Sequence, residues 1–130
     1  MAARRAADLV PPTGTRHVLL QCTKAIGPFE RAAFSQAGVD LVGSLRTDLF
    51  LASLTARGVS TKALQAMDGL ADVRPVRRSW KLHPFLRTGK RPVWAIVKGD
   101  ASALDPTVGV YVLLYSDVAL DPDGRAAVAR

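Results

Sequence analysis

Few of the residues that usually mark a chemical site occur in this sequence. Among its 130 residues there is one cysteine, Cys22, and there are two histidines, His17 and His83. A single cysteine excludes a disulfide within the chain, and two histidines supply too few ligands for a zinc site of the usual kind. The sequence therefore predicts neither a bound metal nor a cofactor.

Known catalytic motifs are missing as well. The sequence holds no Gly-Thr-Ser nucleophile turn, no His-Gly-x-His segment, no P-loop and no Gly-x-Gly-x-x-Gly run. Nucleophilic catalysis and phosphate binding depend on such arrangements, because they place a reactive group or a set of backbone amides at a fixed point. We therefore expect a protein that is not itself an enzyme.

Long apolar runs are also lacking. No window approaches the roughly twenty apolar residues of a membrane span, so we expect no membrane partner. Residues 6–10, interrupted by Asp8, are too short for the apolar part of a secretory signal. A secreted or cell-envelope location would thus need a signal outside this sequence, and a cytoplasmic location stays open. Residues 1–15 are interpreted as a flexible lead-in.

Composition and charge are those of a small globular protein with a basic surface. Hydrophobic residues make up 48% of the chain, enough for one modest core or for a domain with an added fragment. Eighteen Lys and Arg residues against eleven Asp and Glu give a net charge of +7. This charge favours acidic partners and says nothing about the fold.

The first part of the chain predicts a strand followed by a helix. Residues 17–23 alternate between apolar and polar side chains, as a half-buried strand requires. Pro28 suits the first position of a helix, Phe29 and Phe34 are expected in its core-facing side, and Gly38 can end it in the left-handed conformation.

Two further strands and a second helix follow. Residues 39–44 and 49–55 read as strands, and their short connection predicts antiparallel pairing. Ser60 or Thr61 can cap a helix that runs to Met67.

Residues 73–79 would form a fourth strand. Pro75 cannot donate to a strand ladder, so this strand is expected at an edge of the sheet. The order of elements over residues 16–84 predicts an α+β domain of the ferredoxin-like, split βαβ class, with two helices on one face of a βαββαβ antiparallel sheet. Residues 85–107 read as a connector in which 93–97 could form a short strand. Residues 108–130 read as the start of a second unit, with a strand at 108–115 and a clipped helix from Gly124.

Three runs carry a resemblance to a known family: Gly-Val-Asp-Leu-Val at 38–42, Leu-Phe-Leu-Ala-Ser-Leu-Thr at 49–55, and the segment 64–76 with its Asp-Gly loop and Val-x-x-Val strand. They resemble the propeptide-type domain that precedes the catalytic domain of subtilisin-like serine peptidases. Residues 81–86, followed by 110–118, also resemble long-prodomain members of that family, in which a second propeptide-like unit begins.

The resemblance implies a protein-binding module that acts as intramolecular chaperone and inhibitor of a secreted subtilisin-like catalytic domain in the same precursor. Its open sheet face would pack on two helices of the peptidase, and the segment after the fourth strand would enter the substrate cleft as an added strand. The docking residues would be Leu19, Gln21, Leu51 and Ser53, with Arg77 and Arg78 at the place where family members carry acidic residues. The cleft-filling tail would be Ser79, Trp80, Lys81, Leu82, His83 and Pro84, continuing to Leu86.

Two other interpretations fit parts of the sequence. An RNA-binding or other ligand-binding ferredoxin-like module would agree with the net charge, but RNA binders need outward aromatic residues on the central strands, and the alternation points Phe50 inward. The aromatic pattern thus argues against nucleic acid as a partner. Separately, an unpartnered strand at 108–115 could pair with another chain, which would give a homodimer through an exposed strand edge.

Overall fold

The computed structural model describes residues 1–99, 104, 107–119 and 121–129. The chain forms two compact units, one of Met1–Val76 with Tyr115–Arg130 and the other of Arg77–Leu114. Among the described residues, those that are buried lie in the first unit, and none of the second is buried. In this described part of the chain, the hydrophobic core therefore belongs to the first unit.

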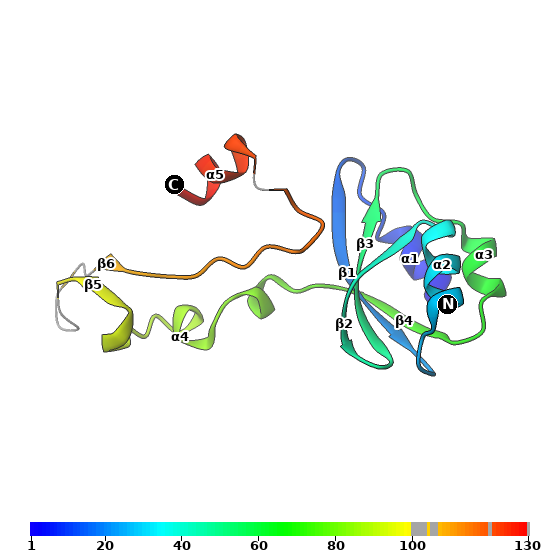
Figure 1. Cartoon of the computed structure of the whole chain (residues 1–130), viewed down its shortest axis with the longest axis horizontal. Helices are drawn as coiled ribbons and strands as arrows, with labels where there is room; N and C mark the ends of the chain where they lie inside the picture. The colour runs from blue at the N-terminus through cyan, green and yellow to red at the C-terminus, as the bar shows by residue number, and fades with distance from the viewer. Residues whose placement is uncertain (100–103, 105–106, 120, 130) are drawn as a thin grey trace. The chain divides into compact units, whose positions relative to one another are not determined.

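The first unit is built on a four-stranded sheet (Figure 1). Strands β1 (Thr15–Cys22), β2 (Val39–Arg46), β3 (Leu49–Thr55) and β4 (Leu70–Pro75) lie in the order β2-β3-β1-β4, and every neighbouring pair is antiparallel. Helix α2 (Pro28–Gln36) joins β1 to β2, and α3 (Thr61–Ala66) joins β3 to β4. This is the predicted α+β, ferredoxin-like arrangement, and β4 is an edge strand as its proline indicates.

The core lies on one face of this sheet, because alternate side chains of each strand point to the same side. Leu20 pairs with Phe50 on one neighbouring strand and with Val73 on the other. Together with Val18 and Leu54, these side chains are at most 2% exposed. Val18, Leu20, Phe50 and Leu54 thus meet in the core beneath the helices, and the inward direction that the sequence predicts for Phe50 is confirmed.

Helix α2 begins and ends where the sequence predicts, with Pro28 in its first turn and Gly38 at a φ of 93° just after its end. Phe34 is 1% exposed, but Phe29 is 90% exposed, so the expectation that both are core residues is wrong for Phe29. Five residues correspond to roughly 500° of helical rotation, which places the two rings on different sides of the helix.

The amino end is a helix, α1 (Ala2–Asp8), where the sequence suggested a flexible lead-in. Ala3 and Ala6 are buried in the core cluster, and Arg5 forms an ion pair with Asp72 of β4. Helices α1, α2 and α3 all cover the same face of the sheet (Figure 1). An alanine-rich segment buries little area per residue, so the hydrophobic pattern of residues 1–15 gave no sign of this packing.

The second unit consists of short elements. Helical turns η1 (Arg78–Lys81), α4 (Pro84–Arg87) and η2 (Val93–Ala95) precede the small antiparallel pair β5 (Ile96–Lys98) and β6 (Thr107–Val108). Part of the predicted connector, residues 100–103 and 105–106, lies outside the described residues.

Of the strand expected at 108–115, only Val108 belongs to a strand. A strand is stabilised by hydrogen bonds to its neighbours, and β6 has only the short β5 beside it. The expected helix is present as α5 (Pro122–Ala129), and the Asp121 carboxylate accepts a hydrogen bond from the Gly124 backbone N–H at 2.7 Å.

No helix in the described part of the chain is both long and apolar enough to span a membrane.

Candidate functional site

The face of the sheet opposite the three helices carries the predicted docking residues on the central strands β1 and β3. Leu19 lies directly across from Leu51, and Gln21 lies across from Leu49. Leu19, Gln21 and Leu51 are each partly exposed, in contrast to their buried neighbours in the same strands. Residues that face each other across an antiparallel pair present their side chains as one surface. This surface, which we call the outer face, is therefore centred on two leucines.

At one end of the outer face a hydrogen-bond network fixes the polar side chains. Gln21 Nε2 donates to the Asp48 backbone carbonyl at 3.1 Å and to its Oδ2 at 3.0 Å. Arg46 donates to Gln21 Oε1 at 3.3 Å and to Asp48 Oδ1 at 3.2 Å. The amide nitrogen and the amide oxygen of Gln21 both already have hydrogen-bond partners. Gln21 therefore stabilises the outer face and has little hydrogen-bonding capacity left for a partner.

The other end of the outer face is covered by the chain itself. His17, which lies across from Ser53, stacks its ring on Tyr115 with centroids 3.8 Å apart. His17 Nε2 is 2.8 Å from Asp117 Oδ1 and 3.1 Å from Oδ2. Burial, and then the charge of Asp117, raise the pKa of the Tyr115 hydroxyl. The segment 115–117 thus caps this end of the face.

The predicted docking residues of the sheet therefore differ in their accessibility to a partner. Ser53 is only 4% exposed and lies at the covered end, so it is not available to a partner as the sequence suggested. Its burial comes from packing that alternation within one strand cannot reveal. Leu19 and Leu51 remain as the open apolar pair.

The predicted tail residues lie in the second unit and are exposed. Residues 78–81 form the turn η1, in which the Trp80 N–H donates to the Arg77 carbonyl at 3.1 Å. His83 Nδ1 accepts a hydrogen bond from the Phe85 N–H at 3.2 Å and so caps helix α4. The tail was expected to be extended, and it is folded into helical turns. Arg77 and Arg78 are exposed at the start of the same segment.

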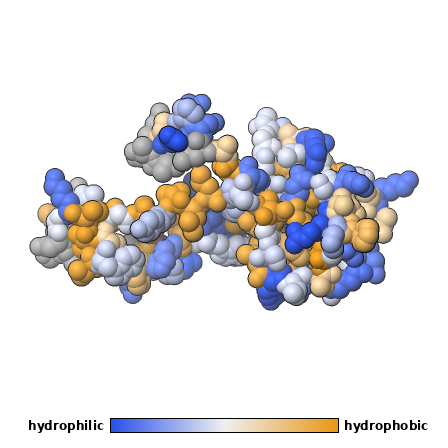
Figure 2. Space-filling view, viewed as in Figure 1, coloured by the Kyte–Doolittle hydropathy of each residue, from blue (hydrophilic) through white to orange (hydrophobic). Residues whose placement is uncertain are grey.

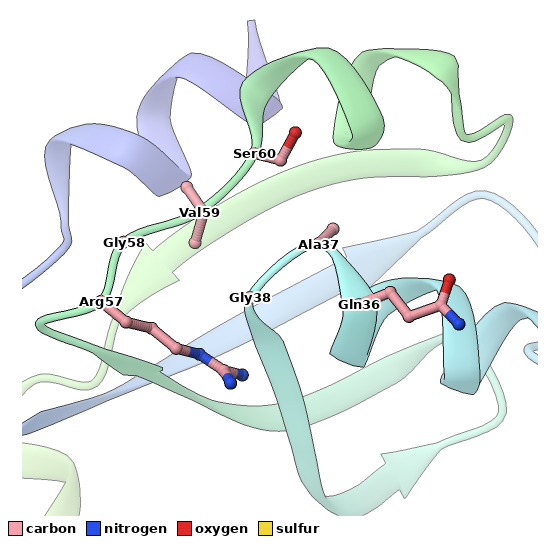
Figure 3. A pocket seen from close by; sticks show the side chains of 7 residues that line it. All are labelled: Gln36, Ala37, Gly38, Arg57, Gly58, Val59 and Ser60. Atoms are coloured by element: carbon pink, nitrogen blue, oxygen red, sulfur yellow. The ribbon is translucent and has the colours of Figure 1, made fainter.

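A shallow opening lies between the end of α2 and the loop leading into α3 (Figure 3). It is lined by Gln36, Ala37, Gly38, Arg57, Gly58, Val59 and Ser60. The Ser60 N–H donates to the Ala37 carbonyl at 2.8 Å, and Arg57 donates to Asp40 at 3.3 Å, which holds the two segments together. Its lining includes no nucleophile activated by a base and no pair of carboxylates, so we interpret it as a packing seam.

The described residues show neither a metal-ligand cluster nor an activated thiol. No group of three or more His, Cys, Asp or Glu is placed there to hold a metal ion. Cys22 is buried, and burial together with the nearby Asp48 carboxylate raises the pKa of its thiol to about 11. A thiol with such a pKa is protonated at neutral pH and is a poor nucleophile.

Comparison with protein-family profiles, with curated proteins and with solved structures finds no match to this chain.

Proposed function

We propose that the chain is a non-catalytic prodomain module of a subtilisin-like serine peptidase, which docks its outer face on the peptidase domain of the same precursor. Acting there, it would assist folding of that domain and inhibit it. The sequence resemblance over residues 38–76 motivates the proposal, and the observation that carries it is the partly exposed pair Leu19 and Leu51 at the centre of the outer face.

This leucine pair suits a helical partner. It lies on two adjacent central strands, so it forms a flat apolar patch, whereas the polar groups beside it are already bonded to one another. An apolar patch with satisfied polar neighbours can be desolvated without leaving a buried group unpaired. The tail residues follow β4 in sequence and are not buried, so little packing opposes their rearrangement into an added strand.

The RNA-binding alternative receives less support from the fold. Ferredoxin-like RNA binders stack bases on aromatic residues of the outer face. Phe50 is 2% exposed and lies on the helix-covered face. His17, the one aromatic ring on the outer side of β1, is already stacked on Tyr115.

Inhibition of a subtilisin-like peptidase by the full chain tests the proposal. We expect inhibition at about micromolar concentration, weakened by Leu51→Arg about tenfold, because a charge buried on docking costs more than 1 kcal/mol. Phe29→Arg is the matched control, since Phe29 is exposed on the helix that covers the opposite face. If the wild-type chain neither inhibits the peptidase nor speeds its refolding, the proposed function is wrong. If Leu51→Arg and Phe29→Arg lose inhibition equally, the outer face is not the docking site.

A further inference from the structure

A tight turn near the carboxyl end of the chain rests on the outer face. Residues 115–118 form this turn, which is closed by a 3.0 Å hydrogen bond from the last backbone N–H to the first carbonyl. The turn presents two different groups to one imidazole, because the Tyr115 ring stacks on His17 and the Asp117 carboxylate lies 2.8 Å from its Nε2. We call residues 115–117 the strap.

The packing of the strap is concentrated at one ring. Across residues 107–119, Tyr115 is the one residue that is not exposed. The Asp117 side chain is 31% exposed, so solvent reaches the ion pair. A single ring stack and a partly solvated ion pair are each weak contacts. The apolar side chains that lead into the strap lie at the surface (Figure 2), namely Val108, Val110, Tyr111, Val112, Leu113 and Leu114.

The strap lies beside the leucine pair of the outer face. His17 and Leu19 point to the same side of β1 and are two residues apart, a separation of roughly 7 Å along the strand. A helix is about 10 Å wide with its side chains, and packed helices have axes roughly 8–10 Å apart. A helix laid along β1 would pass over both residues, and of two helices laid across the strands one would reach His17. Docking on a pair of helices is therefore incompatible with the strap in its present place.

We propose that the strap is an autoinhibitory contact, which covers one end of the outer face in the free chain and is displaced when the peptidase domain docks. The inference rests on the proposed function, because the peptidase domain is the partner that displaces the strap. A weak contact suits this role. The covalent connection keeps the strap at a high effective concentration near His17, whereas a partner that buries the whole outer face gains far more contact area than the strap gives up.

The strap should set the affinity of docking through the fraction of molecules in which it is open. When a partner binds only the open state, its observed Kd equals the Kd for that state divided by the open fraction. A strap that is closed in about nine molecules of ten would weaken docking about tenfold. Opening it would also uncover Ser53, which lies across from His17 and is 4% exposed in the closed state.

Tyr115 gives the test a direct probe of the strap. The chain has two tyrosines, so Tyr111→Phe leaves Tyr115 as the single site for 3-fluorotyrosine. In the full chain, Asp117→Ala should move the fluorine resonance toward its position in the unfolded chain. Addition of a subtilisin-like catalytic domain, inactivated at its active-site serine, should move the resonance in the same direction when Asp117 is present. Asp123→Ala is the matched control, because it removes an exposed carboxylate outside the strap and should leave the resonance in place.

Affinity for the same inactivated domain, measured by titration calorimetry, provides the second readout. Asp117→Ala and Tyr115→Ala should each tighten binding about three- to tenfold, because more molecules already expose the outer face. The double variant should bind little more tightly than the better single variant, since both side chains hold the same imidazole. Asp123→Ala, with the same change in net charge as Asp117→Ala, should alter Kd less than about twofold.

The outcomes separate this inference from the proposed function. Binding that is unchanged or weaker in both Asp117→Ala and Tyr115→Ala would overturn the autoinhibitory role while leaving the proposed function intact. A Tyr115 resonance that stays in place when the domain binds would do the same, because docking would then leave the strap closed. Absence of binding by the wild-type chain and by all variants would overturn both.

Discussion

The imidazole ring of His17 lies parallel to the phenol ring of Tyr115, with an interplanar angle of 18° and centroids 3.8 Å apart. This contact, together with the Asp117 carboxylate, places residues 115–117 over the end of the outer face that contains Ser53. A partner that occupies the whole outer face must therefore displace this segment first. A partner that contacts only Leu19 and Leu51 can bind without displacing residues 115–117.

Replacing His17 by alanine should release Tyr115. The raised pKa of Tyr115 is caused first by burial and then by Asp117, and the variant removes the ring that covers the phenol. We expect the pKa of the Tyr115 hydroxyl to fall toward its ordinary value of about 10. Absorbance titration of the phenolate in a Tyr111→Phe background isolates this hydroxyl. An unchanged pKa in the His17→Ala variant would show that the stacking does not cover Tyr115 in solution.

Two phenylalanines of helix α2 provide a test of the core. Phe34 is 1% exposed and Phe29 is 90% exposed. Phe34→Ala should lower the free energy of unfolding by about 3–5 kcal/mol, because it removes a buried ring and leaves a cavity. Phe29→Ala should change it by less than about 0.5 kcal/mol. Urea unfolding followed by circular dichroism measures both, and similar values for the two variants would contradict the orientation of this helix.

Gly38 is held at a φ of 93°, and a Cβ added there would lie 2.4 Å from the Gly58 carbonyl oxygen. Gly38→Ala should therefore destabilise the fold by more than the roughly 1–2 kcal/mol that the left-handed conformation costs by itself. Gly14→Ala is the matched control, because Gly14 also has a positive φ but has open space around its Cβ position. Thermal unfolding compares the two, and equal shifts in midpoint would rule out the steric part of this prediction.

Cys22 should resist modification in the folded protein. With its pKa raised to about 11 by burial and by Asp48, about one thiol in a thousand is ionised at pH 8, and the sulfur is shielded as well. Ellman's reagent should react slowly with the native chain and rapidly after unfolding in guanidinium. Rapid stoichiometric reaction of the native chain at pH 8 would contradict the burial of this strand face.

Asp72 should make the stability of the fold depend on pH in the acidic range. The Arg74 side-chain hydrogen bond is the main cause that lowers the Asp72 pKa, with smaller contributions from the Val73 N–H and the Arg5 charge. A carboxyl with a lowered folded-state pKa stabilises the fold above its unfolded pKa of about 3.9, and this stabilisation is lost as the pH falls through the folded-state pKa. Asp72→Asn should therefore lower stability at pH 6 and lower it less at pH 2.

The control for this pH dependence is Asp68→Asn, since the Asp68 side chain is 99% exposed and its contact with Lys24 is 3.8 Å long. Stability of that variant should follow the wild-type pH profile closely, because exposed ion pairs contribute little. Urea midpoints between pH 2 and pH 6 make the comparison. If the profile of Asp72→Asn also coincides with that of the wild type, the ion pairs with Arg5 and Arg74 do not contribute to stability.

The sequence predicted the ferredoxin-like unit well because its signals are local. Alternation in residues 17–23 identified β1, Gly38 marked the end of a helix, and Pro75 marked an edge strand. Each of these depends on the backbone preferences of a few neighbouring residues. Boundaries were less accurate, since β4 begins at Leu70 rather than at residue 73.

What the sequence could not predict depends on distant contacts. Helix α1 packs through Ala3 and Ala6, whose small side chains give no clear apolar pattern. Ser53 is buried at the end of the face that residues 115–117 cover, which no property of β3 itself indicates. The apolar run after residue 108 has high strand propensity, but propensity does not supply a neighbouring strand.

The exposure of the described residues of Arg77–Leu114, none of which is buried, also has a consequence for the lifetime of the chain. Exposed backbone without packed side chains is where proteolytic enzymes cut most readily. A single nick there would separate the polypeptide into two pieces, and the imidazole–phenol stack with the carboxylate at position 117 contributes only about 1–2 kcal/mol to holding them together. The carboxyl-terminal piece would therefore dissociate and uncover the end of the outer face, with the four-stranded sheet intact.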